Sequence, residues 1–277
     1  MTDTFELYRL SLLPRKQASI LTPDAEKSFT REEYLRQIFM ISHKFNHFGN
    51  ELHYVPAKNE PSSEALLGRI GRTFSTNENL PPDEGLADAV HQGWRAVVIV
   101  IDPRHHADGQ KVAVERTSKV GDPQGLLNSL IKAINLSNPD SPYLIEASAI
   151  FDSRSFWEFA ENNQGAITSL TFEFITPNMF GGIDDISEEL KKYRNIEKAQ
   201  NVTISMCSQD GLDVTTQRVK ASVDYAQKGG GNIKARARKN KRYNSTKKAK
   251  KVTIQKDSEE PLLKRATRKI LEILGRE

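Results

Sequence analysis

The chain has 277 residues, of which 37% are hydrophobic, so it is long enough to bury a core in one large domain or two small ones. Its formal net charge is +4. Its single cysteine, Cys207, excludes an internal disulfide and a zinc site built from thiolates. The longest apolar run, residues 96–101, is too short to span a bilayer, and no secretory segment is visible, so we expect a cytoplasmic protein that does not act at a membrane.

The first half of the chain has the pattern of mixed strands and helices. A strand is expected at residues 5–13, and Thr30 and Glu33 have the spacing of a capping box at the start of a helix. This helix is expected to bury a stripe of four apolar residues, Tyr34, Ile38, Ile41 and Phe45. Further strands are expected at residues 52–55, 65–74, 94–101 and 111–117. A second amphipathic helix is expected between Asp122 and Asn138.

The pattern changes near residue 140, where we expect a second domain to begin. Strands are predicted at residues 143–151, 170–174 and 202–207, with helices at 153–161 and 184–199 between them. This order favours a small ferredoxin-like layer. The predicted fold class is therefore α+β, with a mixed α/β domain at residues 1–140 and an α+β nucleic-acid-binding domain at 141–277.

The charge is distributed unevenly along the chain. Residues 226–256 hold twelve Lys or Arg residues and no Asp or Glu, so subtracting them from the net charge of +4 leaves −8 for the rest. A concentrated basic segment on an acidic body is typical of a protein that contacts an anionic polymer. We therefore expect residues 226–256 to bind nucleic acid, DNA in preference to RNA.

Alternation within the basic segment predicts a two-stranded ribbon. A helix at residues 215–227 should end at glycines, and residues 232–238 should then form a strand with Lys234, Arg236 and Arg238 on one face. Residues 239–246 are expected to form a polar tip and residues 247–255 the returning strand. The candidate nucleic-acid-binding residues are Lys228, Lys234, Arg236, Arg238, Lys239, Lys241, Arg242, Tyr243, Lys247, Lys248, Lys250 and Lys251.

These residue types indicate how the ribbon would bind. Cations spaced along a strand contact phosphates without reading the base sequence, and Tyr243 is expected to stack on a base. With six to ten phosphate contacts, affinity should fall by roughly 10³–10⁵ between 50 and 200 mM salt. A final helix, from about residue 257 to 274, is expected either to pack on the chain's own body or to pair with a second copy.

Two other functional classes stay open. Residues 102–106 read Asp-Pro-Arg-His-His after a buried strand, and the pair His105 and His106 could serve as acid and base in an RNA-directed toxin or nuclease. Alternatively, the basic ribbon could bind an acidic partner protein, which would make the chain an adaptor. Apart from the histidine pair, no motif predicts a catalytic residue, a metal ligand or a cofactor site.

The order of elements from residue 143 onward resembles that of the RexA-type exclusion proteins of phage lambda and related prophages. The resemblance lies in residues 143–151, then 167–176, then Ser-Gln-Asp-Gly at 208–211 and Asp-Tyr-Ala-Gln-Lys-Gly-Gly at 224–230. It implies a non-enzymatic DNA-binding component of a phage-exclusion or antiviral defence system, dimeric and working with partner proteins. The basic tract is denser than this resemblance implies, which leaves DNA versus RNA open.

Overall fold

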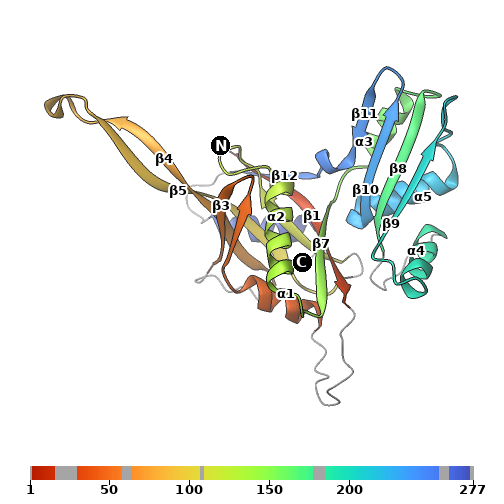
Figure 1. Cartoon of the computed structure of the whole chain (residues 1–277), viewed down its shortest axis with the longest axis horizontal. Coiled ribbons are helices and arrows are strands. Elements are labelled where there is room, and N and C mark those ends of the chain that lie inside the picture. Colours follow the sequence, from red (N-terminus) through yellow and green to blue (C-terminus); the bar gives the residue numbers. More distant parts are fainter. Residues whose placement is uncertain are drawn as a thin grey trace, which may run out of the picture.

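A computed structural model describes residues 2–15, 30–57, 64–106, 109–176, 185–255 and 262–274. Its strands form two separate sheets, and both sheets are antiparallel (Figure 1). The larger sheet contains β1 (Thr2–Pro14), β2 (His43–His47), β3 (Asn50–Pro56), β4 (Leu66–Asn79), β5 (Asp88–Asp102), β6 (Gln110–Glu115), β7 (Tyr143–Ala149) and β12 (Lys251–Gln255). The smaller sheet contains β8 (Ile167–Ile175), β9 (Asn201–Cys207), β10 (Gly231–Ala237) and β11 (Lys241–Asn244). The predicted α+β class is confirmed.

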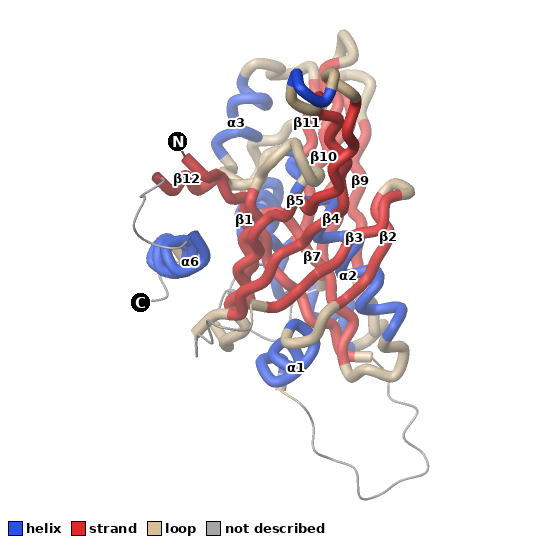
Figure 2. Tube along the Cα trace, turned by 90° about the vertical axis from the view of Figure 1, so that its left-hand side faces the viewer, coloured by secondary structure: helices blue, strands red, loops and turns tan. Residues whose placement is uncertain are grey.

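The larger sheet is organised around β1, whose length lets it pair with three strands. β6 pairs along one edge, while β12 and β7 share the other edge. Alternation sends Tyr8 and Leu10 toward α2 (Pro123–Ser137), and it sends Phe5 and Leu7 toward α6 (Leu262–Ile273). The two helices therefore cover opposite faces of the sheet (Figure 2). The last helix therefore packs on the chain's own body, which was one of the two arrangements expected for it.

Helix α1 (Arg31–Phe39) begins where the sequence predicts, because Thr30 and Glu33 form the expected capping box. The predicted stripe is wrong beyond Ile38. The helix ends at Phe39, Ile41 is 52% exposed, and Phe45 lies in β2. The apolar spacing continues past Phe39 because Ile41 in the turn and Phe45 in the next strand are apolar too, so the spacing does not mark the end of the helix.

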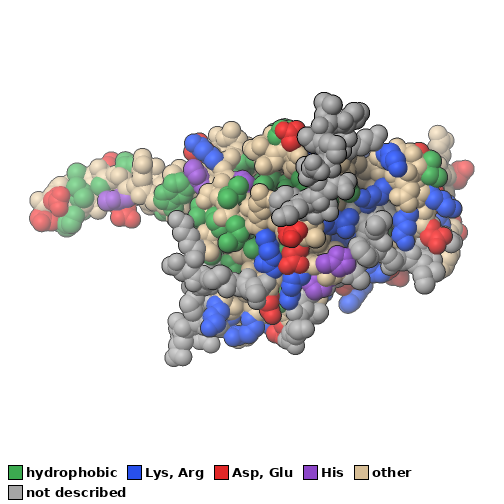
Figure 3. All heavy atoms as spheres, turned by 90° about the horizontal axis from the view of Figure 1, so that it is seen from below, with side chains coloured by type: hydrophobic (Ala, Val, Ile, Leu, Met, Phe, Trp, Pro, Cys, Tyr) green, Lys and Arg blue, Asp and Glu red, His purple; other side chains and the backbone are tan. Residues whose placement is uncertain are grey.

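The hairpin of β4 and β5 extends well beyond the predicted strands. The two strands pair continuously from Leu66 with Ile101 to Asn79 with Asp88. Their far halves leave the body as a narrow two-stranded arm, with exposed apolar side chains along it (Figures 1 and 3). Leu86, Val90 and Trp94 are each more than half exposed. The sequence of this arm is polar and acidic, so no buried pattern indicates strands there.

The smaller sheet has the order β11-β10-β8-β9, with every neighbouring pair antiparallel. Helix α3 (Arg154–Glu161), α4 (Asp185–Asn195) and α5 (Gln217–Tyr225) pack on one face, through a core that includes Phe156, Leu190 and Val223. One split β-α-β crossover is present: β9 leads through α5 to β10, and β8 lies between these two strands in the sheet. The predicted ferredoxin-like arrangement is not confirmed, because it requires two such crossovers.

The two sheets divide the chain differently from the predicted boundary at residue 140. β7 and β12 pair with β1, and α6 packs on that sheet, so three elements of the predicted second domain belong to the larger one. Only residues 151–247 build the smaller unit, which also includes the short helices η2 (Ala226–Gly230) and η3 (Ser245–Lys247).

Candidate nucleic-acid interface

Among the described residues, no helix covers one face of the smaller sheet, and polar side chains line that face. Because directly paired residues of an antiparallel sheet share a face, the strand registers place these side chains in rows. One row contains Arg242, Arg236, Ser169 and Cys207. The next row contains Asn244, Lys234, Thr171 and Ser205. We call this surface the open face. The predicted alternation of β10 is confirmed, since Ile233, Ala235 and Ala237 are buried on the other face.

The cations of the open face differ in their engagement. Arg236 is exposed, and its guanidinium has no hydrogen-bond or ion-pair partner among the described residues. Arg242 donates from Nε to the side chain of Asn240, 3.2 Å away, and keeps the rest of its guanidinium exposed. Lys234 is paired with Glu173 on β8, the acidic side chain nearest to it. The two arginines are therefore the cations most available to an external anion.

A hollow of about 780 Å³ lies over the open face at the β11 edge. It includes Lys234, Arg236 and Arg242 from the two strands, and Lys247 and Lys248 from the segment that follows β11. Ser169 and Thr171 contribute hydroxyl groups, and no Asp or Glu lines it. A concave surface with hydroxyl donors and five cations, of which only Lys234 is paired with a described carboxylate, is suited to a polyanion.

The other predicted binding residues do not all reach this surface. Arg238 directly follows β10, and its guanidinium donates to the carbonyl of Gln209. Lys239 lies in the β10–β11 turn with a φ of +58°. Lys241 pairs with Ala237, which places it on the helix-covered side of the sheet. Lys250 directly precedes β12 and Lys251 is the first residue of that strand, which belongs to the larger sheet.

Lys228 lies at the base of the smaller sheet, in η2, and it is ion-paired with Asp224. Burial acts to raise the pKa of Asp224, but hydrogen bonds from Lys228 and Gln227 outweigh burial and hold that pKa below its usual value.

The predicted ribbon is wrong in its second strand. β11 is the partner of β10, and residues 247–255 cross to the larger sheet instead. The twelfth basic residue of the tract, at 256, lies outside the described residues.

Tyr243 does not have the predicted exposure. It is 5% exposed, its ring packs against Phe156 and Phe159 of α3, and its hydroxyl lies 2.9 Å from that of Ser155. Burial raises the pKa of this phenol. The stacking role is wrong, because Tyr243 faces the core by the same alternation that exposes Arg242.

The sequence reasoning missed the hydroxyl groups of the open face. Ser169 and Thr171 alternate with buried Leu170 and Phe172, and Ser205 follows half-buried Ile204, so period-two alternation would have found them. The hydroxyls of Thr171 and Ser205 lie 3.1 Å apart. Cys207 is exposed on the same face.

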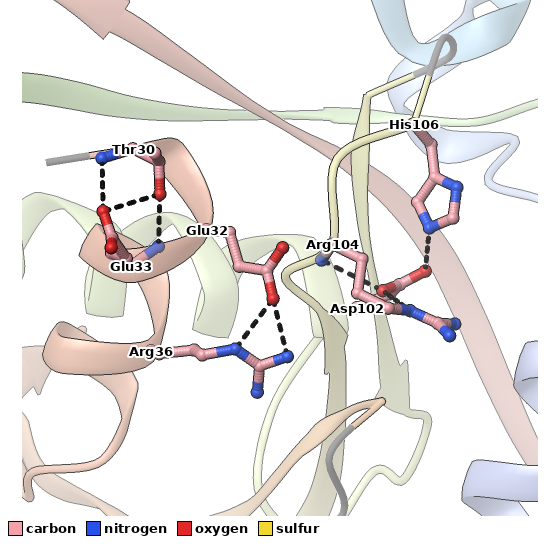
Figure 4. Close-up of polar contacts among 7 residues, drawn as sticks. All are labelled: Thr30, Glu32, Glu33, Arg36, Asp102, Arg104 and His106. Carbon is pink, nitrogen blue, oxygen red and sulfur yellow. Dashed lines mark hydrogen bonds and ion pairs between the residues drawn. The ribbon is translucent and has the colours of Figure 1, made fainter.

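The second candidate constellation, the loop after β5, is held by a buried carboxylate. Asp102 is 1% exposed, and its oxygens lie 3.0 Å from Nε of Arg104 and 3.2 Å from Nε2 of His106 (Figure 4). His106 is therefore positioned by Asp102. Among the described residues, no group of three or more His, Cys, Asp or Glu residues could hold a metal ion.

Comparison with known proteins finds no matching family model and no matching curated protein. Within the described residues, none of the helices has the length and apolar character needed to cross a membrane.

Proposed function

We propose that the protein binds nucleic acid through the open face of the smaller sheet, by contacts to phosphates and not to base edges. The observation that carries this proposal is the pairing of Arg236 and Arg242 beside Lys234, Lys247 and Lys248, in a hollow without carboxylates. Guanidinium groups form two parallel hydrogen bonds to a phosphate, which makes arginine pairs effective on a nucleic-acid backbone.

The geometry of the strands suits a repeating anion. Same-face residues on a strand repeat at ~7 Å, a spacing comparable to that of successive phosphates, and neighbouring strands lie ~4.8 Å apart. Lys234 and Arg236 have the first spacing, and Arg236 and Arg242 have the second. The hydroxyls of Ser169 and Thr171 are placed to donate further hydrogen bonds to the same backbone. No base-reading group is assigned, so the expected binding is largely independent of sequence.

The salt dependence of binding tests this proposal. Because the eleven described cations of the tract are divided between surfaces, we expect about four phosphate contacts and not six to ten. Affinity should then fall by roughly 50- to 150-fold between 50 and 200 mM salt. The measurement is fluorescence anisotropy with duplex DNA, single-stranded DNA and RNA of one sequence. Binding that is absent at 50 mM salt, or insensitive to salt, would refute the proposal.

The biological setting that we propose is phage exclusion, and it rests on the resemblance to RexA-type proteins, which also favours DNA as the ligand. A chain with this role should reduce phage plating when it is expressed in a host, alone or with a partner protein. We expect the double variant Arg236→Gln/Arg242→Gln to lose that reduction at unchanged protein level. Equal plating on cells with the wild-type chain and on cells without it would remove this part of the proposal.

A second candidate function is nuclease activity at the loop after β5, favoured by one observation. A buried carboxylate beside an imidazole, as in Asp102 and His106, can orient a histidine for proton transfer. If this pair is catalytic, RNA or DNA cleavage by the purified protein should fall at least ~100-fold in His106→Ala. His105→Ala serves as the neighbouring control. Cleavage that is absent, or unchanged in His106→Ala, excludes the candidate.

A further inference from the structure

The far part of the β4–β5 hairpin projects beyond the rest of the larger sheet (Figure 1). We call residues 73–94 the arm. β3 pairs with β4, and β6 with β5, only at the base of the hairpin, so no described strand flanks the arm on either edge. Three large apolar side chains stand open to solvent on it: Leu86 is 57% exposed, Val90 64% and Trp94 60%. Because a two-stranded ribbon alone is only marginally stable in water, an arm of this length gains stability when another surface covers it.

The arm is acidic. Residues 73–94 contain four Asp or Glu residues and no Lys or Arg. Asp83 and Glu84 lie at its tip, in the short helix η1 (Pro82–Glu84), and both are exposed. Their carboxylates have no hydrogen-bond or ion-pair partner among the described residues, and Figure 3 shows acidic side chains at this end of the arm. Phosphates would be repelled by this charge, so the arm is suited to a cationic surface and not to nucleic acid.

The hollow over the open face has the opposite charge. Five Lys or Arg side chains line it and no Asp or Glu does, and only Lys234 is paired with a described carboxylate. Phe159 and Ala235 lie beside these cations in the lining, so the hollow also offers apolar contacts. Complementary charge draws two surfaces together and disfavours partners of like charge. The arm and the hollow are therefore matched in the sign of their charge, and both combine charged with apolar groups.

The two surfaces are too far apart to meet within one molecule. Figure 1 shows the arm at one end of the longest axis and the smaller sheet at the other end. A second copy removes this obstacle, because two chains placed antiparallel along their long axes bring each arm beside the smaller sheet of the other copy. Both contacts can form at once, which closes the assembly as a two-fold dimer and leaves neither arm uncovered.

We infer that the arm of one copy docks in the hollow of a second copy, with the carboxylates of its tip against Arg236 and Arg242. The exposed apolar side chains of the arm lose contact with water in the same step, which contributes the apolar part of the binding free energy. This docking does not depend on the proposed function. One consequence does rest on it: the docked arm covers the cations that we propose contact phosphates, so the arm and nucleic acid exclude each other.

Sedimentation equilibrium of the full chain tests the docking in the absence of nucleic acid. The wild type should be a dimer at about 50 mM salt and should dissociate toward about 500 mM, because this change shortens the Debye length roughly threefold. Asp83→Asn/Glu84→Gln should weaken the dimer at least ~10-fold, since each dimer then loses the contacts of four carboxylates. The matched control, Asp140→Asn/Glu188→Gln, removes two exposed carboxylates away from the arm and should leave the dimer unchanged.

A charge exchange between two variants identifies the surfaces in contact. Asp83→Lys/Glu84→Lys reverses the charge at the tip of the arm, and Arg236→Glu/Arg242→Glu reverses it at the two arginine positions of the hollow. Each variant alone should be monomeric. Their equimolar mixture should form a heterodimer, because each tip then meets residues of opposite charge. The inference is overturned if the wild type is monomeric at low salt, if Asp83→Asn/Glu84→Gln dimerises like the wild type, or if the mixture stays monomeric.

Competition with nucleic acid separates this inference from the proposed function. Duplex DNA added to the wild-type dimer should release DNA-bound monomers. Asp83→Asn/Glu84→Gln should bind DNA several-fold more tightly than the wild type, because none of it is held in the closed dimer, whereas Asp140→Asn/Glu188→Gln, of equal net charge, should not. A salt-sensitive dimer with no DNA binding by any of these proteins would refute the proposed function and leave the docking standing. DNA that binds the dimer without dissociating it would overturn the mutual exclusion.

Discussion

Replacing Arg236 and Arg242 by glutamine is expected to weaken nucleic-acid binding by roughly 100-fold or more at low salt. The two side chains lie opposite each other on β10 and β11, at the β11 edge of the open face. A hydrogen bond to a charged group contributes about 1.5–3 kcal/mol, and each 1.4 kcal/mol is a tenfold change in affinity. The measurement is a binding titration by anisotropy with single-stranded and duplex DNA. All sequences should lose affinity alike, because phosphates carry no sequence information.

The matched control for this variant is Arg218→Gln. Arg218 is exposed on α5, on the helix-covered side of the same sheet, and is ion-paired with Glu189. It changes the net charge of the smaller unit without touching the open face, so affinity should fall less than threefold. Both proteins should unfold at similar temperatures, since all three arginine side chains are on the surface. A comparable loss in Arg218→Gln would mean that net charge, and not the open face, governs binding.

Replacing Tyr243 by alanine is expected to destabilise the smaller unit by about 3–5 kcal/mol, the usual cost of deleting a large buried aromatic ring. The ring fills the space between β11 and α3, where it contacts Phe156 and Phe159. Denaturant unfolding followed by tryptophan fluorescence would measure this change, because Trp157 of α3 packs against the same cluster.

Tyr243→Phe separates packing from base stacking. It keeps the ring and loses the hydroxyl contact with Ser155, so stability should fall by only about 1 kcal/mol and nucleic-acid affinity should not change. A stacking residue would give the opposite pattern, in which Tyr243→Ala keeps its fold and loses affinity. That pattern would contradict the packing seen here.

The local rules of strand and helix formation predicted most elements of this chain. Period-two alternation located β8 and β10 together with their buried faces, since one face of each strand packs on helices. The Thr30 capping box and the Asp122 N-cap fixed the starts of α1 and α2. These features depend on residues within a few positions of each other, which is why sequence alone was sufficient.

The pairing of strands was the part that sequence could not predict. The stretch 247–255 has strand character whether it pairs with β10 or with β1, and only the complete fold decides between them. For the same reason the twelve cations looked like one surface, although the structure divides the eleven that it describes between two sheets.

The central claim is that phosphates lie against the open face, and the slope of log affinity against log salt tests it most directly. Each lost phosphate contact makes that slope shallower by about 0.7 to 0.9. The wild type and Arg236→Gln/Arg242→Gln should therefore differ in slope by about 1.4 to 1.8. Parallel lines of equal slope for the two proteins would contradict the account, because the arginines would then make no contact with the nucleic-acid backbone.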